Sequence, residues 1–281
     1  MRETKDALQL RFGDFATEAD IPEAAIPEDA QKAWQLLANR GVCRRFTPDV
    51  VPPQIVDILC ALALSSPVKS DLQQRDILIV EDAGKRARIN ALLEDQDWLP
   101  ATPNFIVFLG NNRRHRQIHE WRGKPFINDH LDAFFNTAVD AAIALSAFVL
   151  AANAAGIGCC PVSTIRNHAQ EVSGLFDLPD HVYPVAGLGF GYPAGETHIS
   201  ARLPLSATVH RDRFDDSAIQ ADVDAYDQRR NGIFPYRQQR DVERFGKAEF
   251  YGWSEDKARQ YSNPERQDFG SFIRRKGFNL K

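Results

Sequence analysis

The residues that could carry chemistry form a dispersed set and not one compact motif. The set comprises Arg40, Arg44, the polar run PVKSDLQQ, Gln96, the turn PVST at 161–164, and Arg202. An isolated arginine usually lies on a solvated face and an isolated glutamine usually caps a neighbouring segment, so no member identifies a site by itself. The order of these segments along the chain is the informative feature.

Motifs for nucleotide binding, hydrolysis and metal chemistry are missing from the sequence. There is no G-x-G-x-x-G fingerprint and no Walker loop, and the fragments GLGFG at 187–191 and GIG at 156–158 are explained by tight packing and a helix cap. There is also no G-x-S-x-G elbow. His115 and His119 would share a helix face, but no third ligand accompanies them. Classical hydrolase chemistry is excluded, and no metal site is expected.

Composition places the chain among ordinary globular proteins. Its 281 residues are 43% hydrophobic and 26% charged, with a formal net charge of -4, and this length allows one or two domains. The slightly acidic balance argues against nucleic acid as a partner, because binding to phosphates needs a basic surface. The charged start MRETKDALQLRFGDF has no secretory signal pattern, which favours a cytoplasmic location.

One uncharged stretch requires a test for membrane insertion. Eighteen residues, from Ala141 to Gly158, contain no charged side chain. Alanine forms helices well but anchors poorly in a membrane, and small residues on every face suit a helix surrounded by protein. We therefore expect a buried central helix that ends near Gly156, and no membrane partner.

The spacing of apolar residues predicts helices and strands that do not alternate regularly. Expected helices cover 27–38, 54–66, 83–96 and 168–179, and expected strands cover 76–82, 104–110 and 182–193. The segment 159–167 is expected to be a turn and 202–210 to be extended. This pattern favours a layered α+β domain over a doubly wound sheet.

The order of several segments resembles the FMN-dependent nitroreductase family. The segments are NRGVCRRF, SSPVKSDLQQRDILIV, DQDWLPATPNFIVF, DAAIALSAFVLAANAAGIGCCPVSTIRN and LFDLPDHVYPVAGLGFGYPA, from about 40 to 204. The later stretches RLPLSATVH, AYDQRR, YGWSEDKARQYS and FIRRKGFNL are similar to the long-tailed, NADPH-preferring oxygen-insensitive nitroreductases and flavin reductases. The resemblance implies a mostly antiparallel sheet flanked by helices, an extended C-terminal arm, and a homodimer with FMN at its interface.

The resemblance also implies an FMN site, residue by residue. Arg44, with Arg40 beside it in the motif, would pair with the FMN phosphate through the fork of its guanidinium. Arg202 matches the arginine of a family K-x-R pair, whose lysine is Ser200 here. The remaining implied contacts are Ser70, Asp71 and Gln73 to the ribityl chain and ring edge, Gln96 to the pyrimidine carbonyl, and the turn Pro161, Val162, Ser163 and Thr164, whose backbone N–H groups at Ser163 and Thr164 face flavin N5 and O4.

The implied reaction is two-electron hydride transfer from NADPH or NADH to a nitroaromatic, quinone or flavin in a ping-pong mechanism, with no side-chain acid or base required. Arg237 and Arg240 are the candidates for the 2'-phosphate of NADPH, although they could equally serve only to solubilise a loop. Two alternatives stay open: a flavoenzyme on the same scaffold that reduces an activated double bond, and a flavin-binding protein without turnover. The flavin-binding protein without turnover is motivated by Val68, Asp71 and Ser200, which differ from the residues that are usual at these positions in the family.

These assignments predict the division of the chain. Residues 1–26 are expected to form an N-terminal arm, 27–214 the FMN-binding domain, and 215–281 a C-terminal extension that wraps the dimer partner.

Overall fold

The computed structural model describes residues 2–13 and 26–281, and the chain forms two compact units. The first unit combines Met1–Gly41 with His198–Glu265, and the second combines Val42–Thr197 with Arg266–Lys281. These boundaries differ from the predicted ones at 26 and 214. Arg44 and Arg202, which we expected in one domain, belong to different units, because the chain after 197 returns to the N-terminal helices.

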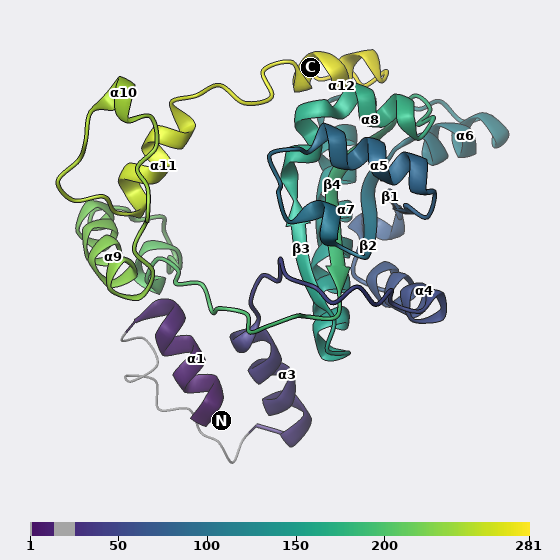
Figure 1. Ribbon diagram of the computed structural model, residues 1–281. Coiled ribbons are helices and arrows are strands. Elements are labelled where there is room, and N and C mark those ends of the chain that lie inside the picture. Colours follow the sequence, from purple (N-terminus) through teal and green to yellow (C-terminus); the bar gives the residue numbers. More distant parts are fainter. Residues whose placement is uncertain (1, 14–25) are drawn as a thin grey trace. The chain divides into compact units, whose positions relative to one another are not determined.

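A four-stranded antiparallel sheet lies in the second unit (Figure 1), as predicted. Its strands are β1 (Arg75–Ile79), β2 (Asn104–Asn111), β3 (Gly158–Val162) and β4 (Val182–Gly191), in the order β1-β2-β4-β3. Our expectation of a turn over 159–167 is wrong for its first half, which is strand β3. Pro161 concealed this strand in the sequence, but proline is tolerated on an edge strand, and β3 is at the edge.

Two apolar layers cover the sheet, and the alternation of side chains along the strands assigns residues to each layer. Ile106 and Phe108 of β2 pack with α4 (Pro53–Leu64) and α7 (Leu131–Ala154). The alternate residues of β2 pack on the other face with α5 (Ala83–Leu92) and α8 (Ala169–Leu175). Burial on both faces explains why the β2 sequence is almost continuously apolar.

Helix α7 contains the uncharged stretch. By length and composition it could cross a membrane, although no membrane is part of this structure. Its buried residues, among them Ala141, Ala144 and Phe148, pack in the core of the second unit. The helix ends at Ala154, and Gly156 follows with a φ of 73°, as the sequence predicts.

The last residues of the chain also belong to the second unit. Phe272, Ile273 and Phe278, on and after α12 (Phe269–Arg275), form a small core with Tyr183 of β4. Lys276 is buried and donates from Nζ to Ser173 Oγ at 3.1 Å and to the Leu178 carbonyl at 2.7 Å. Burial lowers the pKa of this lysine. The end of the predicted extension is therefore part of its own chain's fold.

The first unit is helical. It contains α1 (Arg2–Phe12), α3 (Glu28–Asn39), α9 (Ile219–Ile233), α10 (Val242–Phe245) and α11 (Trp253–Tyr261). The expected N-terminal arm is corrected in part, because Arg2–Phe12 forms a helix that packs on α3. The rest of that predicted arm, 14–25, lies outside the described residues. The segment 202–210, expected to be extended, contains the short 3₁₀ helix η5 (Leu205–Ala207).

The second unit has further short elements. They are α6 (Arg113–Trp121) and the 3₁₀ helices η2 (Lys69–Asp71), η3 (Leu99–Ala101) and η4 (Ser163–His168). Both η2 and η4 contain residues that the sequence assigns to the site.

Candidate functional site

Arg40 and Arg202 are joined in the first unit by a third arginine, Arg11 at the end of α1. The buried Arg11 guanidinium donates from Nε to the Ala38 carbonyl at 2.7 Å and from Nη1 to the Ser200 carbonyl at 3.3 Å. Its Nη2 donates to the carbonyl of Arg40. One side chain therefore connects the end of α3 to the segment that carries Arg202.

The main chain of Arg11 extends the same cluster. Its carbonyl accepts the Arg202 N–H at 2.7 Å and Arg229 Nη2 at 3.1 Å, and Arg229 also donates to the Arg202 carbonyl at 2.6 Å. Burial, together with the charges of Arg202 and Arg40, lowers the pKa of Arg11 to about 10. Among the described residues, no carboxylate forms an ion pair with any of these four arginines, so the cluster suits an anion.

Arg44 lies in the second unit, with its side chain exposed beside strand β3. It forms a hydrogen bond with the thiol of Cys160, and burial raises the pKa of that thiol to about 11. Cys43 is buried, and its N–H donates to the Cys159 carbonyl at 3.0 Å. Burial raises the pKa of both the Cys43 and the Cys160 thiols, whereas the Arg44 side chain is exposed.

The loop that carries Ser70, Asp71 and Gln73 has an unusual backbone. These residues have φ values of 48°, 56° and 52°, in the left-handed region that side chains disfavour. Each such residue costs on the order of 1–3 kcal/mol unless its surroundings impose the conformation. All three side chains are exposed, and Gln73 Nε2 donates to Asp71 Oδ1 at 3.1 Å.

Asp140 of α7 imposes the conformation of this loop. Its carboxylate is buried, Oδ1 accepts the Lys69 N–H at 3.2 Å, and Oδ2 accepts the Gln74 N–H at 3.1 Å. The two bonds hold the loop at both ends. From α6, His115 Nε2 contacts the Leu72 carbonyl, so this histidine also serves the loop.

Gln96 is placed in a short loop after α5, where its side chain bonds to its neighbours. Its Nε2 donates to Asp95 Oδ2 at 2.9 Å, and its Oε1 accepts from Trp98 Nε1 at 3.2 Å. The side chain is half-buried. These two hydrogen bonds therefore orient the Gln96 side chain before any ligand binds.

The turn 161–164 begins where β3 ends. Val162 is buried and pairs with Gly187 of β4, and Ser163 is the first residue of η4. The first N–H groups of a helix have no partner within it, so Ser163 and Thr164 are suitable donors to a ligand. In the part of the chain that the structure describes, the buried Thr164 Oγ1 also has no hydrogen-bond partner. The turn thus offers polar groups for a ligand to satisfy.

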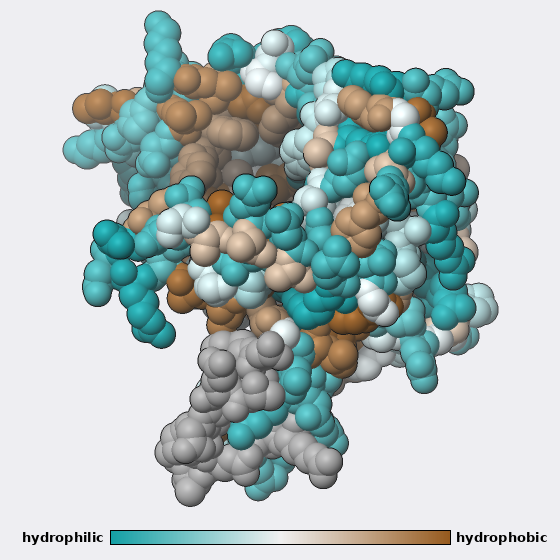
Figure 2. All heavy atoms as spheres, turned by 90° about the vertical axis from the view of Figure 1, so that its left-hand side faces the viewer, coloured by the Kyte–Doolittle hydropathy of each residue, from teal (hydrophilic) through white to brown (hydrophobic). Residues whose placement is uncertain are grey.

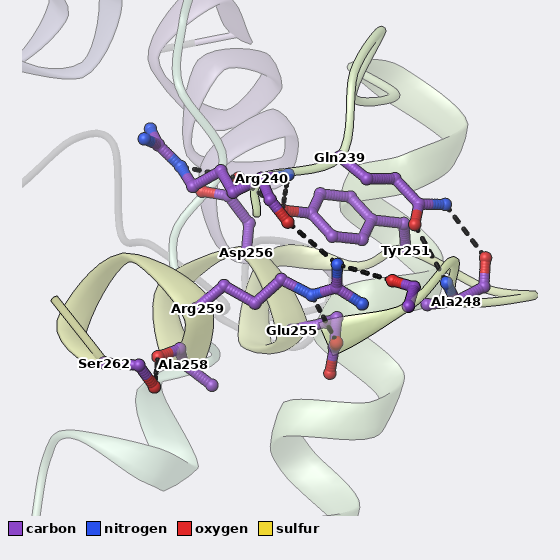
Figure 3. A network of polar contacts seen from close by, with 10 residues as sticks. Gln239, Arg240, Ala248, Tyr251, Glu255, Asp256, Ala258, Arg259 and Ser262 are labelled. Atoms are coloured by element: carbon purple, nitrogen blue, oxygen red, sulfur yellow. Dashed lines mark hydrogen bonds and ion pairs between the residues drawn. The ribbon is translucent and has the colours of Figure 1, made fainter. Parts of the chain in front are cut away.

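Arg240 belongs to a polar network in the first unit (Figure 3). Its Nε lies 3.1 Å from Oδ1 of the buried Asp256, and its N–H donates to Tyr251 Oη at 2.9 Å. Although burial alone would raise it, the pKa of Asp256 is held below its usual value by hydrogen bonds from Lys257 and Tyr251. Both arginines are exposed, but Arg240 is paired with an ionised carboxylate, whereas Arg237 forms no ion pair among the described residues.

Two residues of the site were not found from the sequence. Arg11 falls in the segment expected to be an arm, and no pattern connects it to 40 or 202. Asp140 had a signal, because a carboxylate directly before an uncharged helical run is buried with it and must find donors there.

Comparisons with known proteins identify the family of the chain. The nitroreductase family matches residues 37–192, and the C-terminal domain of the nitroreductase family matches residues 200–281. The FMN reductase (NADPH) of Bacillus subtilis is 26% identical over 249 residues, which cover 87% of this chain and 97% of that protein. The oxygen-insensitive NADPH nitroreductase of Salmonella typhimurium is 29% identical over 180 residues, covering 64% and 73% respectively.

A solved structure supports the same family. The structure of B. megaterium NfrA2 matches with a TM-score of 0.80 at 26% identity, covering 89% of this chain and 99% of that one. The chain belongs to the nitroreductase family. Two findings define this class: the antiparallel sheet with helices on both faces, and the match of the family to more than half of the residues. The resemblance drawn from the sequence is thereby confirmed.

Proposed function

We propose that the chain is an FMN-dependent NAD(P)H oxidoreductase that reduces nitroaromatics, quinones or flavins by two-electron hydride transfer. The observation that carries the proposal is the arginine cluster around Arg40 and Arg202, which has an excess of positive charge among the described residues. Relatives named FMN reductase and NADPH nitroreductase support the same function.

The residues present fit FMN. Arg40 and Arg202, both in the first unit, would hold the phosphate. The N–H groups of Ser163 and Thr164 would donate to the ring, and the unpartnered Thr164 Oγ1 favours a polar ligand there. The loop of Ser70, Asp71 and Gln73 and the oriented Gln96 would bind the ribityl chain and the ring edge.

When bound, FMN supplies the hydride chemistry, and the chain supplies binding, orientation and charge. Cations near the ring would stabilise its reduced, anionic form. NADPH and the acceptor would use the same space in turn, which gives ping-pong kinetics. Arg237 is the stronger candidate for the 2'-phosphate of NADPH, because Asp256 already neutralises Arg240.

Purified protein is expected to be yellow, to contain FMN, and to be bleached by NADPH without oxygen and recoloured by a nitroarene. Absorbance spectroscopy measures each step, and ranking acceptors by their reoxidation rate would identify the substrate class. Bound FMN that neither NADPH nor NADH reduces would favour a flavin-binding protein without turnover. This alternative is suggested by Ser200, which replaces the lysine of the family's K-x-R pair. Protein that takes up no added FMN would contradict the proposal.

The sheet itself favours a homodimer with FMN at the interface. The loop of Ser70 to Gln73 precedes β1 and the turn 161–164 follows β3, and these are the two outer strands. Because two strands lie between β1 and β3, the backbones of these outer strands are about 14 Å apart. Two chains would allow the loop of one subunit to approach the turn of the other across a single flavin.

Exposed apolar rows on two packed helices support the same proposal. Ile58 and Leu62 of α4 are 59% and 51% exposed, and Leu131, Phe135 and Val139 form an exposed row at four-residue spacing on α7. Such patches mark protein interfaces.

The C-terminal extension exposes large apolar side chains as well. The face drawn in Figure 2 has apolar side chains among hydrophilic ones. The exposed apolar residues of α9–α11 and the loops between them are Ile219, Ile233, Phe234, Val242, Phe245, Phe250 and Tyr261. They favour the interpretation that part of the segment 215–281 covers the dimer partner.

Leu62→Asp is expected to convert the dimer to a monomer and to lower FMN retention, because it places a charge in the proposed interface. Sedimentation velocity of the flavin-loaded protein measures the state. Trp121→Asp on α6, where the side chain is 70% exposed, is the matched control and should remain dimeric. A wild-type monomer that retains FMN would contradict the proposed interface.

A further inference from the structure

We infer that Arg11, from the helix that precedes the family-matched region, supplies to the cofactor phosphate the positive charge that Ser200 lacks, and positions Arg40 and Arg202 around it. This inference rests on the proposed function. Helix α1 ends at Phe12, whereas the family match begins at residue 37. A segment outside the family's common region would thus complete the anion site.

The contacts of Arg11 connect it to this role. Its Nη1 donates to the carbonyl of Ser200 itself, and its Nη2 donates to the carbonyl of Arg40. Its own carbonyl accepts the Arg202 N–H. Each of the two proposed phosphate arginines is therefore fixed through its main chain to the same residue. The exposed Arg202 guanidinium donates from Nη1 to the carbonyl of the neighbouring Ala201 at 3.1 Å, and its Nε and Nη2 carry no hydrogen bond among the described residues.

The hydrogen bonds of Arg11 do not explain why a charged side chain occupies this position. A buried guanidinium is costly, and it repels Arg40 and Arg202 beside it. Neutral donors could satisfy carbonyl oxygens at lower cost. An anion bound at the cluster would offset that repulsion, which makes the arginine favourable in the loaded protein.

The test compares FMN with riboflavin, which is the same flavin without the phosphate. Arg11→Met is expected to raise the Kd for FMN about tenfold and to leave the Kd for riboflavin within about twofold. Quenching of flavin fluorescence measures both, using apoprotein made from the purified chain. A Ser200→Lys change added to Arg11→Met should restore FMN affinity, because it returns a cation to the same place.

Ser200→Lys in the wild-type background provides a second variant that leaves Arg11 intact. If Arg11 already supplies the charge, the added lysine changes FMN affinity by less than about threefold, and the two substitutions are strongly non-additive. A gain of tenfold or more from Ser200→Lys alone would overturn the inference. Equal losses for FMN and riboflavin in Arg11→Met would also overturn it, since they indicate a purely structural role.

The outcomes separate this inference from the proposed function. Wild-type protein that binds no FMN would overturn both. Wild-type protein that binds FMN, together with an Arg11→Met variant that binds it equally well, would overturn the role of Arg11 alone.

Discussion

Asp140→Asn is expected to lower the free energy of unfolding by about 3 kcal/mol and to weaken both FMN and riboflavin binding roughly tenfold. The carboxylate accepts two backbone N–H groups, from Lys69 and Gln74, in a buried position. An asparagine has one oxygen, so one N–H would face an amide N–H instead. A charge-assisted bond is lost and a buried donor is left unsatisfied.

The lost hydrogen bond should weaken flavin binding, because the loop between the two bonds carries proposed flavin contacts. Ser70, Asp71 and Gln73 have left-handed backbones, and we expect them to keep this costly conformation only while both ends of the loop are held. When one end is released, these residues can relax to ordinary conformations and move away from their proposed contacts. Since those contacts involve the ribityl chain and ring, riboflavin should be affected as much as FMN, in contrast to Arg11→Met.

Asp132→Asn is the matched control for this prediction. Asp132 lies on the same helix, and its carboxylate pairs with Lys69 Nζ at 3.1 Å, where both side chains are 48% exposed. Exposed pairs of this kind contribute little. Urea denaturation and flavin titration should find this variant like the wild type. An Asp140→Asn variant that matches it in both assays would mean that the carboxylate does not hold the loop.

The sequence was sufficient for the sheet and its main helices because their apolar periodicity is strong. β2 and β4 are nearly continuous apolar runs, and α3, α4 and α5 lie where the pattern predicts them. β3 was missed because Pro161 and the two cysteines before it have no alternation that marks a strand. Only pairing with β4 reveals it.

The site residues divide in the same way. Residues inside family motifs, such as Arg44 and the turn 161–164, could be proposed from order and spacing. Arg11 could not, because its relation to Arg40 and Ser200 depends on contacts across 29 and 189 positions of the chain. The division into units was missed for the same reason: the return of Arg202 to Arg11 is a tertiary contact without a local signal.

Gly187→Ala is expected to be among the most destabilising single-methyl additions in this chain, at about 3 kcal/mol. Gly187 lies in β4, between Val107 of β2 and Val162 of β3. A Cβ atom there would lie 2.5 Å from Cζ of Phe105, whose ring is 1% exposed. A buried ring in a close-packed core cannot move aside at low cost.

Gly174→Ala is the matched control, and urea denaturation of both variants measures the difference. Gly174 lies in α8, and a Cβ atom there would meet no described atom within 4 Å beyond its chain neighbours and the backbone of its own helix. Alanine favours a helix over glycine by about 1 kcal/mol, so this variant should be slightly more stable than the wild type. Because Gly187 pairs with Val162, directly before the turn of Ser163 and Thr164, the Gly187 variant should also bind flavin more weakly. Equal stability of the two variants would show that the Phe105 ring can yield, and that the packing between β4 and this ring is looser than the distances indicate.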